Sequence, residues 1–263
     1  MDFIEDLFEI IDNIDSFNLI CIKNDNTITS YIKKEQKLWE YWLEKYIKEL
    51  YVENTNMIDI GAHIGTFSLM MSKYISQKSH IYAFEPVYNK ILTTNIENNN
   101  LTNKVKIFPI GLSNITEQLE GGFIDFKLPR NYGFTQLDKL NKINENSKLI
   151  INIDKLDNYN IENVSFIKID VEGSEYKVLE GCIETIMKNT PTILIEIWCT
   201  SKNSIQKYMK NENDIFESRN ALKCFEFLFN LGYICFPVSP TSDDFIFIHY
   251  KKKELIKKII DIL

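Results

Sequence analysis

The stretch MIDIGAHIG, residues 57–65, decides the fold of this chain. Residues 56–60 are mostly apolar and predict a buried strand, and the two glycines, four positions apart, predict a tight turn that leads into a helix over residues 66–73. Because Gly61 and Gly65 carry no side chains, a ligand can lie against bare backbone at this turn. The stretch therefore predicts the first strand, loop and helix of a Rossmann-like nucleoside site.

The spacing of the glycines separates two classes of ligand. A dinucleotide site needs glycines at the first, third and sixth positions of the loop to hold a pyrophosphate, and here the third position is His63. S-adenosylmethionine has no phosphate and does not need that pattern. Glu85 follows a second predicted strand, residues 80–84, and its carboxylate can accept hydrogen bonds from both ribose hydroxyls. These features favour S-adenosylmethionine over NAD.

Composition and charge exclude several other classes of protein. At 263 residues the chain suits one α/β domain with additions, large enough for a core without disulfides or metals. Hydrophobic residues make up 44% and charged residues 25%, as in ordinary globular proteins. The net charge is −7, and Arg130 and Arg219 are the only arginines. A surface for nucleic acid normally has a basic balance rich in arginine, so we expect no nucleic-acid partner.

Cysteine usage and hydropathy predict a cytoplasmic protein. Five cysteines without a C-x-x-C pair argue against a disulfide framework and a zinc ribbon. The acidic amino terminus lacks the features of a signal peptide, and no stretch reaches the length of a membrane span, so we expect no stable membrane insertion. Residues 251–263 alternate lysines with apolar residues and predict a closing helix with solvated lysines.

Residues 1–52 predict an amino-terminal cap in front of a main domain, residues 53–263. In the cap we expect an amphipathic helix, a hairpin and an aromatic-rich helix, at residues 3–14, 24–26 and 34–51. Strands and helices then alternate, which implies a parallel sheet with crossover helices. The expected strands are 56–60, 80–84, 105–110, 164–169, 192–198, 233–238 and 244–249, and the expected helices are 66–73, 87–99, one that ends at Lys188, 204–209 and 219–231. Residues 111–157 break the pattern and predict an insertion with an apolar alternation at 149–153, a usual place for substrate determinants.

A second group of acids follows the predicted strand 164–169. Ligands of an open doubly wound sheet bind beyond the carboxyl ends of its strands, so Asp170 should face the glycine loop. Glu172 follows closely, and Glu175 is better explained as a cap of the next helix. Glu196 lies in an apolar strand, where an unpaired charge is costly, so it should point into the same cleft or accept hydrogen bonds.

The motifs resemble those of FkbM-type methyltransferases. The resemblance rests on D-I-G-A-H-I-G at 59–65, F-E-P at 84–86, L-D at 156–157, F-I-K-I-D-V-E-G-S-E at 166–175 and L-I-E-I at 194–197. The family usually has asparagine where this chain has His63. The resemblance implies a class I methyltransferase domain over residues 53–263, an α/β Rossmann-like fold whose seven-stranded, mostly parallel sheet has the order 3-2-1-4-5-7-6 with helices on both faces. It also implies S-adenosylmethionine-dependent O-methylation of sugars or secondary metabolites.

Roles for individual residues follow from these patterns. Asp170 is the preferred base or orienter of an acceptor hydroxyl, with Glu172 and Glu196 as further catalytic candidates. A divalent ion between Asp170 and Glu196 could lower the pKa of that hydroxyl, but two carboxylates do not define a metal site, so none is predicted. Cofactor contacts are expected from Asp59, Gly61, Ala62, His63, Gly65, Glu85, Pro86, Gly111, Leu112 and, at the methyl end, Asp170.

The acceptor is expected against the insertion. Asn131, Tyr132, Gly133 and Phe134 offer polar and aromatic groups of the kind that bind a sugar, with Trp39, Tyr41 and Trp42 as weaker candidates. The predicted function is O-methylation of a sugar or glycan precursor. A non-sugar secondary metabolite, or a non-catalytic nucleoside-binding protein of the same fold, are the alternatives. A homodimer is compatible with the sequence, whereas a nicotinamide-dependent reductase and an N-methylating enzyme lack their expected motifs.

Overall fold

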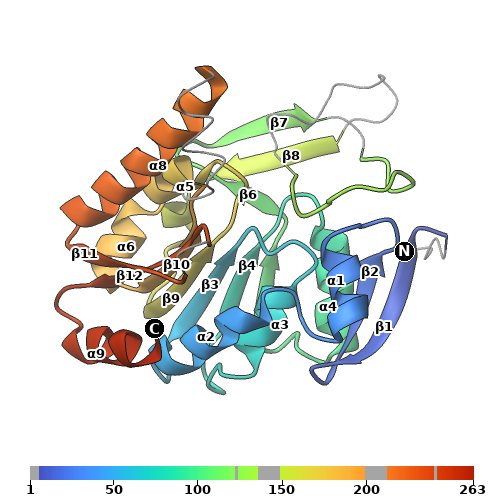
Figure 1. The fold of residues 1–263 in the computed structure, drawn as a ribbon, viewed down its shortest axis with the longest axis horizontal. Helices are drawn as coiled ribbons and strands as arrows, with labels where there is room; N and C mark the ends of the chain where they lie inside the picture. Colours follow the sequence, from blue (N-terminus) through green and yellow to red (C-terminus); the bar gives the residue numbers. More distant parts are fainter. Residues whose placement is uncertain (1–5, 122–123, 136–148, 199–211, 240–241) are drawn as a thin grey trace.

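A seven-stranded sheet forms the centre of the molecule (Figure 1). The computed structural model describes residues 6–121, 124–135, 149–198, 212–239 and 242–263. The strand order is β11-β12-β10-β9-β3-β4-β5, with only β12 antiparallel to its neighbours. Counted along the chain, this is the predicted order 3-2-1-4-5-7-6, which is confirmed. The strands are β3 (Asn56–Ile60), β4 (Ile81–Phe84), β5 (Val105–Phe108), β9 (Val164–Ile169), β10 (Thr192–Glu196), β11 (Tyr233–Pro237) and β12 (Asp244–His249).

Helices cover both faces of this sheet, as predicted (Figure 1). Successive side chains of a strand point to opposite faces, so Met57 joins one hydrophobic cluster while Ile58 joins the other. The first cluster includes residues of α2 (Glu44–Leu50), α3 (Thr66–Ser72), α4 (Asn89–Asn98) and α9 (Lys253–Ile262). The second includes residues of α5 (Glu175–Gly181), α6 (Ile183–Asn189) and α8 (Glu212–Asn230). The two clusters therefore lie on opposite faces of the sheet.

The amino-terminal segment differs from its prediction. In place of the expected first helix, β1 (Phe8–Ile14) pairs with β2 (Phe17–Ile22), so the hairpin turns near Asp15 and not at 24–26. Left-handed backbone at Asn13, Asp15 and Ser16 makes this turn. The expected helix at 34–51 is split into α1 (Ile28–Glu35), a 3-10 turn η1 (Tyr41–Leu43) and α2. Left-handed residues at 36 and 40 break the continuous helix.

The insertion contains a small sheet of its own. The strand expected at 105–110 ends at Phe108, because Pro109 cannot donate a ladder hydrogen bond, and β6 (Ile110–Leu112) starts a second sheet. This sheet has the order β6-β8-β7, with β7 (Glu117–Gly121) and β8 (Leu149–Asp154), and β8 is the predicted apolar alternation. It is followed by a 3-10 turn η3 (Leu156–Tyr159).

Differences in the second half are small. The helix expected to end at Lys188 is divided into α5 and α6 at Cys182, whose backbone is not helical. Gly181, just before this break, packs so closely on Ser113 that a Cβ would lie 1.9 Å from the Ser113 carbonyl oxygen. α8 begins before its expected start, and the predicted helix at 204–209 lies outside the described residues. In the parts of the chain that the structure describes, no helix combines the length and apolarity required to cross a bilayer.

Candidate active site

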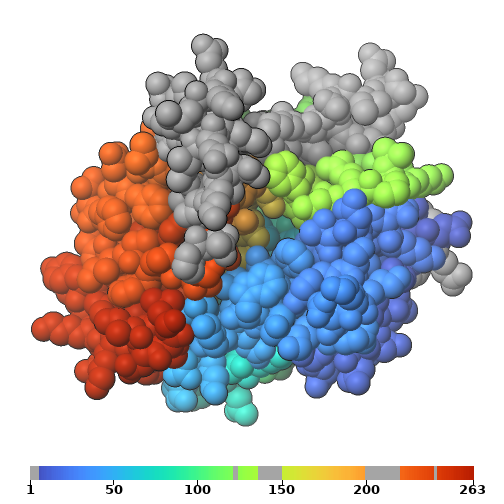
Figure 2. Space-filling view, in the orientation of Figure 1, coloured from blue at the N-terminus to red at the C-terminus, as the bar shows by residue number. Residues whose placement is uncertain are grey.

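A cavity of about 310 Å³ lies at the carboxyl ends of β3, β4, β9 and β10. Its walls come from the glycine loop, the acids after β9 and β10, the insertion and the amino-terminal segment. Figure 2 shows the recess between the blue amino-terminal segment, the yellow-green residues 124–135 and the orange carboxyl-terminal part. Fourteen predicted site residues line it: Trp39, Gly61, Ala62, His63, Glu85, Pro86, Gly111, Leu112, Asn131, Gly133, Phe134, Asp170, Glu172 and Glu196.

The glycine loop is held by main-chain contacts. Gly61 has a φ of 80°, and a Cβ there would lie 1.8 Å from the carbonyl oxygen of Asp170, so only glycine fits between the ends of β3 and β9. The N–H groups of Gly61 and Ala62 both donate to the carbonyl of Phe84, at 3.0 and 3.1 Å. Gly65 begins α3 and packs on Leu92 outside the cavity wall. Its role is thus in helix packing.

Glu85 joins the glycine loop to the start of the next helix. Its carboxylate accepts hydrogen bonds from the N–H groups of His63 (2.8 Å), Val87 (2.7 Å) and Tyr88 (2.9 Å). Burial raises the pKa of Glu85 to about 7, against the three N–H donors that lower it. A carboxylate has about four acceptor positions, so one remains for a ligand hydroxyl. Glu85 therefore fixes the loop and presents one acceptor to the cavity.

Asp59 precedes the glycine loop and His63 belongs to it, and the two side chains have different surroundings. Asp59 is fully buried behind the cavity and accepts a 2.6 Å hydrogen bond from the Ser68 hydroxyl, so it braces β3 against α3. His63 lines the cavity edge-on to Tyr88, with ring centroids 4.4 Å apart. Burial, together with the charge of Lys168, lowers the pKa of His63 to about 4, although Asp170 and the Tyr132 backbone act in the opposite direction. The imidazole is neutral at physiological pH.

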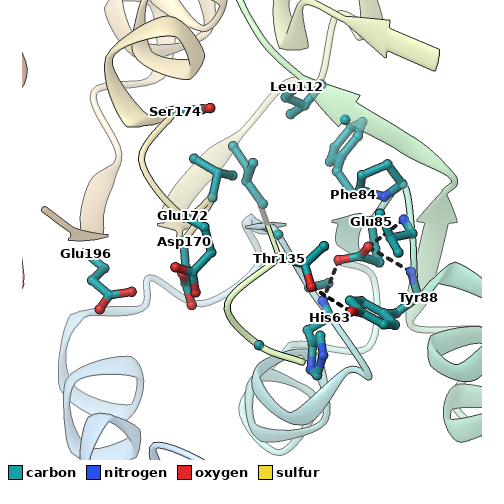
Figure 3. A pocket seen from close by; sticks show the side chains of 18 of the residues that line it. His63, Phe84, Glu85, Tyr88, Leu112, Thr135, Asp170, Glu172, Ser174 and Glu196 are labelled. Atoms are coloured by element: carbon teal, nitrogen blue, oxygen red, sulfur yellow. Dashed lines mark hydrogen bonds between the residues drawn. The ribbon is translucent and has the colours of Figure 1, made fainter. Parts of the chain in front are cut away.

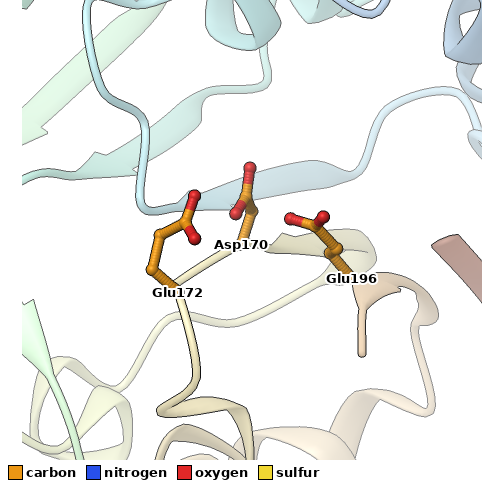
Figure 4. A group of neighbouring side chains, drawn as sticks. All are labelled: Asp170, Glu172 and Glu196. Atoms are coloured by element: carbon orange, nitrogen blue, oxygen red, sulfur yellow. The ribbon is translucent and has the colours of Figure 1, made fainter. Parts of the chain in front are cut away.

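Three carboxyl groups meet on the opposite side of the cavity (Figures 3 and 4). The register of β9 and β10 pairs Ile169 with Ile195, which places Asp170 beside Glu196. Oxygen atoms of Asp170, Glu172 and Glu196 all lie within 4.8 Å of one another. Figure 3 shows this group facing Glu85, His63 and Tyr88. Three oxygens at this spacing could hold a divalent ion, although acids also gather without one.

The three carboxyl groups are in different protonation states at neutral pH. Burial raises the pKa of Asp170, but the Lys168 ammonium, together with Glu196, outweighs it, so the pKa lies below the usual range. Burial and the neighbouring charge of Asp170 raise the pKa of Glu172 to about 9 and that of Glu196 to about 11. At neutral pH Asp170 is therefore a carboxylate that accepts protons or hydrogen bonds, and the two glutamic acids are donors.

Two buried charged residues of the cavity wall were not predicted. Lys168 lies in β9 with an exposed fraction of 7%, and its Nζ is 2.9 Å from Asp170 Oδ2 and 3.7 Å from Glu40 Oε2. A lysine inside an apolar strand must have buried anionic partners. The position of Lys168 in such a strand is therefore the sequence signal that could have identified it as a site residue. Glu40 precedes η1 and has no comparable signal in the sequence. Both residues line the cavity.

Three of the twelve non-glycine residues with left-handed backbone in the described chain lie in the wall of this cavity. Glu40, His63 and Glu172 have φ values of 60°, 50° and 55°, in the left-handed region that non-glycine residues seldom occupy. All three line the cavity. Such strain persists only where surrounding contacts enforce it, and it is common at functional sites.

The insertion residues have separate roles. Asn131, Gly133 and Phe134 line the cavity, and Phe134 stacks on Trp198 with centroids 5.2 Å apart. Tyr132 is fully buried outside the wall, where its hydroxyl donates to the carbonyls of Asp125 and Leu128 at 2.7 Å, so the substrate contact predicted for it is wrong. Among the aromatic residues of the amino-terminal segment Trp39 lines the cavity, whereas Tyr41 and Trp42 do not.

The donor half of the cavity fits a nucleoside. The Gly61 backbone is bare, Glu85 retains one acceptor position, and Phe84, Leu112 and Val171 supply apolar contacts for a base. Ser113, at the end of β6, adds a polar group beside them. The absence of a phosphate-binding glycine pattern agrees with a phosphate-free nucleoside.

Comparison with known proteins identifies the family. The Methyltransferase FkbM domain matches residues 59–235. The chain is 27% identical over 176 residues to methyltransferase sdnD of Sordaria araneosa, covering 55% of this chain and 67% of that protein. It is 26% identical over 170 residues to methyltransferase 1 of Beauveria bassiana (strain ARSEF 2860), covering 57% and 67%.

Solved structures of low sequence identity are also similar. A methyltransferase FkbM from Methylobacillus flagellatus KT has a TM-score of 0.49 and 17% identity, covering 74% of this chain and 43% of that chain, so this chain spans less than half of its length. An O-methyltransferase from Bacillus cereus in complex with SAH has a TM-score of 0.48 and 15% identity, covering 85% and 90%. The family match over residues 59–235, in a chain with the predicted motifs and sheet order, shows that this protein belongs to the FkbM family of S-adenosylmethionine-dependent methyltransferases.

Proposed function

We propose that this protein transfers a methyl group from S-adenosylmethionine to a hydroxyl of a sugar or glycan precursor. The observation that carries the proposal is one cavity with a nucleoside-type end at Glu85 and an ionised, half-buried carboxylate, Asp170, at the other end. When bound, S-adenosylmethionine supplies a methyl group on a sulfonium, which is already a good leaving group. The protein has chiefly to align the acceptor and accept its proton.

The side chains of the acceptor half have distinct roles in this proposal. Asp170 orients the acceptor hydroxyl and takes its proton, because it alone of the three clustered acids is ionised at neutral pH. Protonated Glu172 and Glu196 donate hydrogen bonds to other oxygens of the acceptor. The stacked rings of Phe134 and Trp198 offer an apolar wall for the C–H face of a sugar.

The direct test is methyl transfer from labelled S-adenosylmethionine to a panel of nucleotide sugars, free glycans and phenolic or polyketide alcohols. We expect product from a sugar-containing acceptor. Product from the non-sugar alcohols alone would contradict the sugar assignment and leave O-methylation standing. Adenosylhomocysteine binding without methylation of any acceptor would favour a non-catalytic nucleoside-binding protein.

A metal requirement can be tested in the same assay. The three carboxyl groups are close enough for a divalent ion, but at neutral pH two of them hold protons, which disfavours metal binding. We therefore expect activity to persist in EDTA. Activity that is lost in EDTA and restored by Mg²⁺ or Mn²⁺ would show that an ion assists deprotonation of the acceptor.

A further inference from the structure

The amino-terminal segment supplies part of the cavity although it lies outside the family match at 59–235. Thr27, Ile28, Trp39 and Glu40 all line the cavity together with Asp170. Glu40 is 8% exposed, so its carboxyl group is directed into the protein and not into solvent. A buried acid from this segment therefore shares a wall with the proposed base.

Glu40 is held in place by its surroundings. Its backbone is left-handed, and its carbonyl accepts a 2.8 Å hydrogen bond from the Leu43 N–H. The N–H of Leu38, just before it, donates to Asp15 Oδ2 at 3.0 Å. Trp39 packs edge-on against Trp42, with centroids 6.0 Å apart. The segment thus fixes the direction of the Glu40 side chain at the cost of backbone strain.

One lysine links Glu40 to the proposed base. Lys168 Nζ is 3.7 Å from Glu40 Oε2 and 2.9 Å from Asp170 Oδ2, and its ammonium also lies 5.0 Å from the ring centroid of Phe67. Asp59 is paired with Lys168 across β3 and β9, which adds a buried acid behind the lysine. The Lys168 ammonium is therefore held between acids of the amino-terminal segment and of the sheet.

We propose that Glu40 is a positioning residue of the acceptor site, which acts through Lys168 on Asp170, so that the amino-terminal segment takes part in acceptor selection. The inference rests on the proposed methyl transfer and extends it to a segment outside the family match. Without Glu40, Lys168 is free to follow Asp170 or to shift toward the other acids, and Asp170 is no longer fixed relative to the acceptor hydroxyl. The donor end at Glu85 has its own main-chain anchors and stays unchanged.

The test compares Glu40→Gln with the matched control Glu44→Gln. Glu44 belongs to the same segment and pairs with a lysine of the main domain, Lys73 at 3.1 Å, but it does not line the cavity. Each variant is assayed for thermal unfolding, adenosylhomocysteine binding by calorimetry, and kcat and KM on the sugar acceptor that the parent protein methylates. We expect Glu40→Gln to lower kcat/KM for the acceptor about tenfold, with donor affinity unchanged and the control at the parent value.

Variants of the lysine provide an independent measurement. Lys168→Met removes the link, and Lys168→Arg retains the cation, so the arginine variant should recover part of the activity that the methionine variant loses. Equal kinetics for Glu40→Gln and Glu44→Gln would overturn the inference, and so would equal loss in Lys168→Met and Lys168→Arg. A parent protein that binds adenosylhomocysteine but methylates no acceptor would instead refute the proposed function, and this inference with it.

Discussion

The two ends of the cavity are built from different interactions. At the donor end the geometry is fixed mainly by main-chain hydrogen bonds. Three backbone N–H groups hold Glu85, and the Phe84 carbonyl holds the glycine loop. At the acceptor end, side-chain charges determine the geometry, with Lys168 between Asp170 and Glu40 and two protonated glutamic acids beside them. The donor end should therefore respond to substitution through binding, and the acceptor end through turnover and pH.

The largest expected effect is on turnover at the acceptor end. Asp170→Asn retains shape and hydrogen bonding but removes the base, so kcat should fall about 10²- to 10⁴-fold. Steady-state kinetics on the parent's acceptor measures this, after thermal unfolding has shown that the variant folds. Full activity in Asp170→Asn would remove the catalytic role and the contrast between the two ends.

A smaller effect is expected on binding at the donor end. Glu85→Ala removes a charged acceptor that contacts the loop and, in the proposal, the ribose, so adenosylhomocysteine affinity should fall about 10- to 100-fold. Calorimetry measures the affinity, and Glu85→Gln serves as control because it retains one acceptor oxygen. Affinity equal to that of the parent in both variants would place the nucleoside elsewhere.

As the pH rises, the free energy of unfolding should fall because of the acids at the acceptor end. Folding raises the pKa values of Glu172 and Glu196 to about 9 and 11, above the unfolded value of 4.5, so the folded state holds protons that the unfolded state has released. This stabilisation is complete below the unfolded value and is lost as pH rises through the folded values. Glu85, with a pKa of about 7, has released most of its proton by about pH 8, so between about pH 8 and 9 the free energy of unfolding should fall by up to about 1.4 kcal/mol per pH unit for each retained proton.

Thermal unfolding across this pH range measures that slope. Glu172→Gln should flatten it, because the amide has no proton to release, whereas Glu85→Gln should leave it nearly unchanged. A slope that is insensitive to Glu172→Gln would show that the acceptor-end glutamic acids do not hold the protons.

The smallest effect is expected at Tyr132. Because its hydroxyl bonds to backbone carbonyls away from the cavity, Tyr132→Phe should cost about 0.5 to 1.5 kcal/mol of unfolding free energy and leave the acceptor KM unchanged. Asn131→Ala, at a residue that lines the cavity, should raise that KM. Denaturant unfolding and acceptor kinetics separate the two residues. A raised KM in Tyr132→Phe would restore its role as a substrate contact.

The sequence predicted the main sheet well because its signals are local. The apolar strands at 56–60 and 164–169, and the acids that directly follow strands, could be read from periodicity and from the geometry of parallel sheets. The amino-terminal segment was misread because its hairpin depends on left-handed residues at 13, 15 and 16 that carry no glycine signal. Glu40 could not be found at all, since its place beside Lys168 is created by tertiary packing. Tyr132 is the opposite case. The sequence places it beside residues that line the cavity, but its side chain is buried in the protein interior.

Adenosylhomocysteine binding to Asp170→Asn tests the central claim most directly, because this claim places the donor and the proposed base at separate ends of one cavity. Calorimetry on the folded variant should give a Kd within about threefold of the parent value while turnover is lost. A variant that loses adenosylhomocysteine binding together with activity would place Asp170 in contact with the donor and contradict the account.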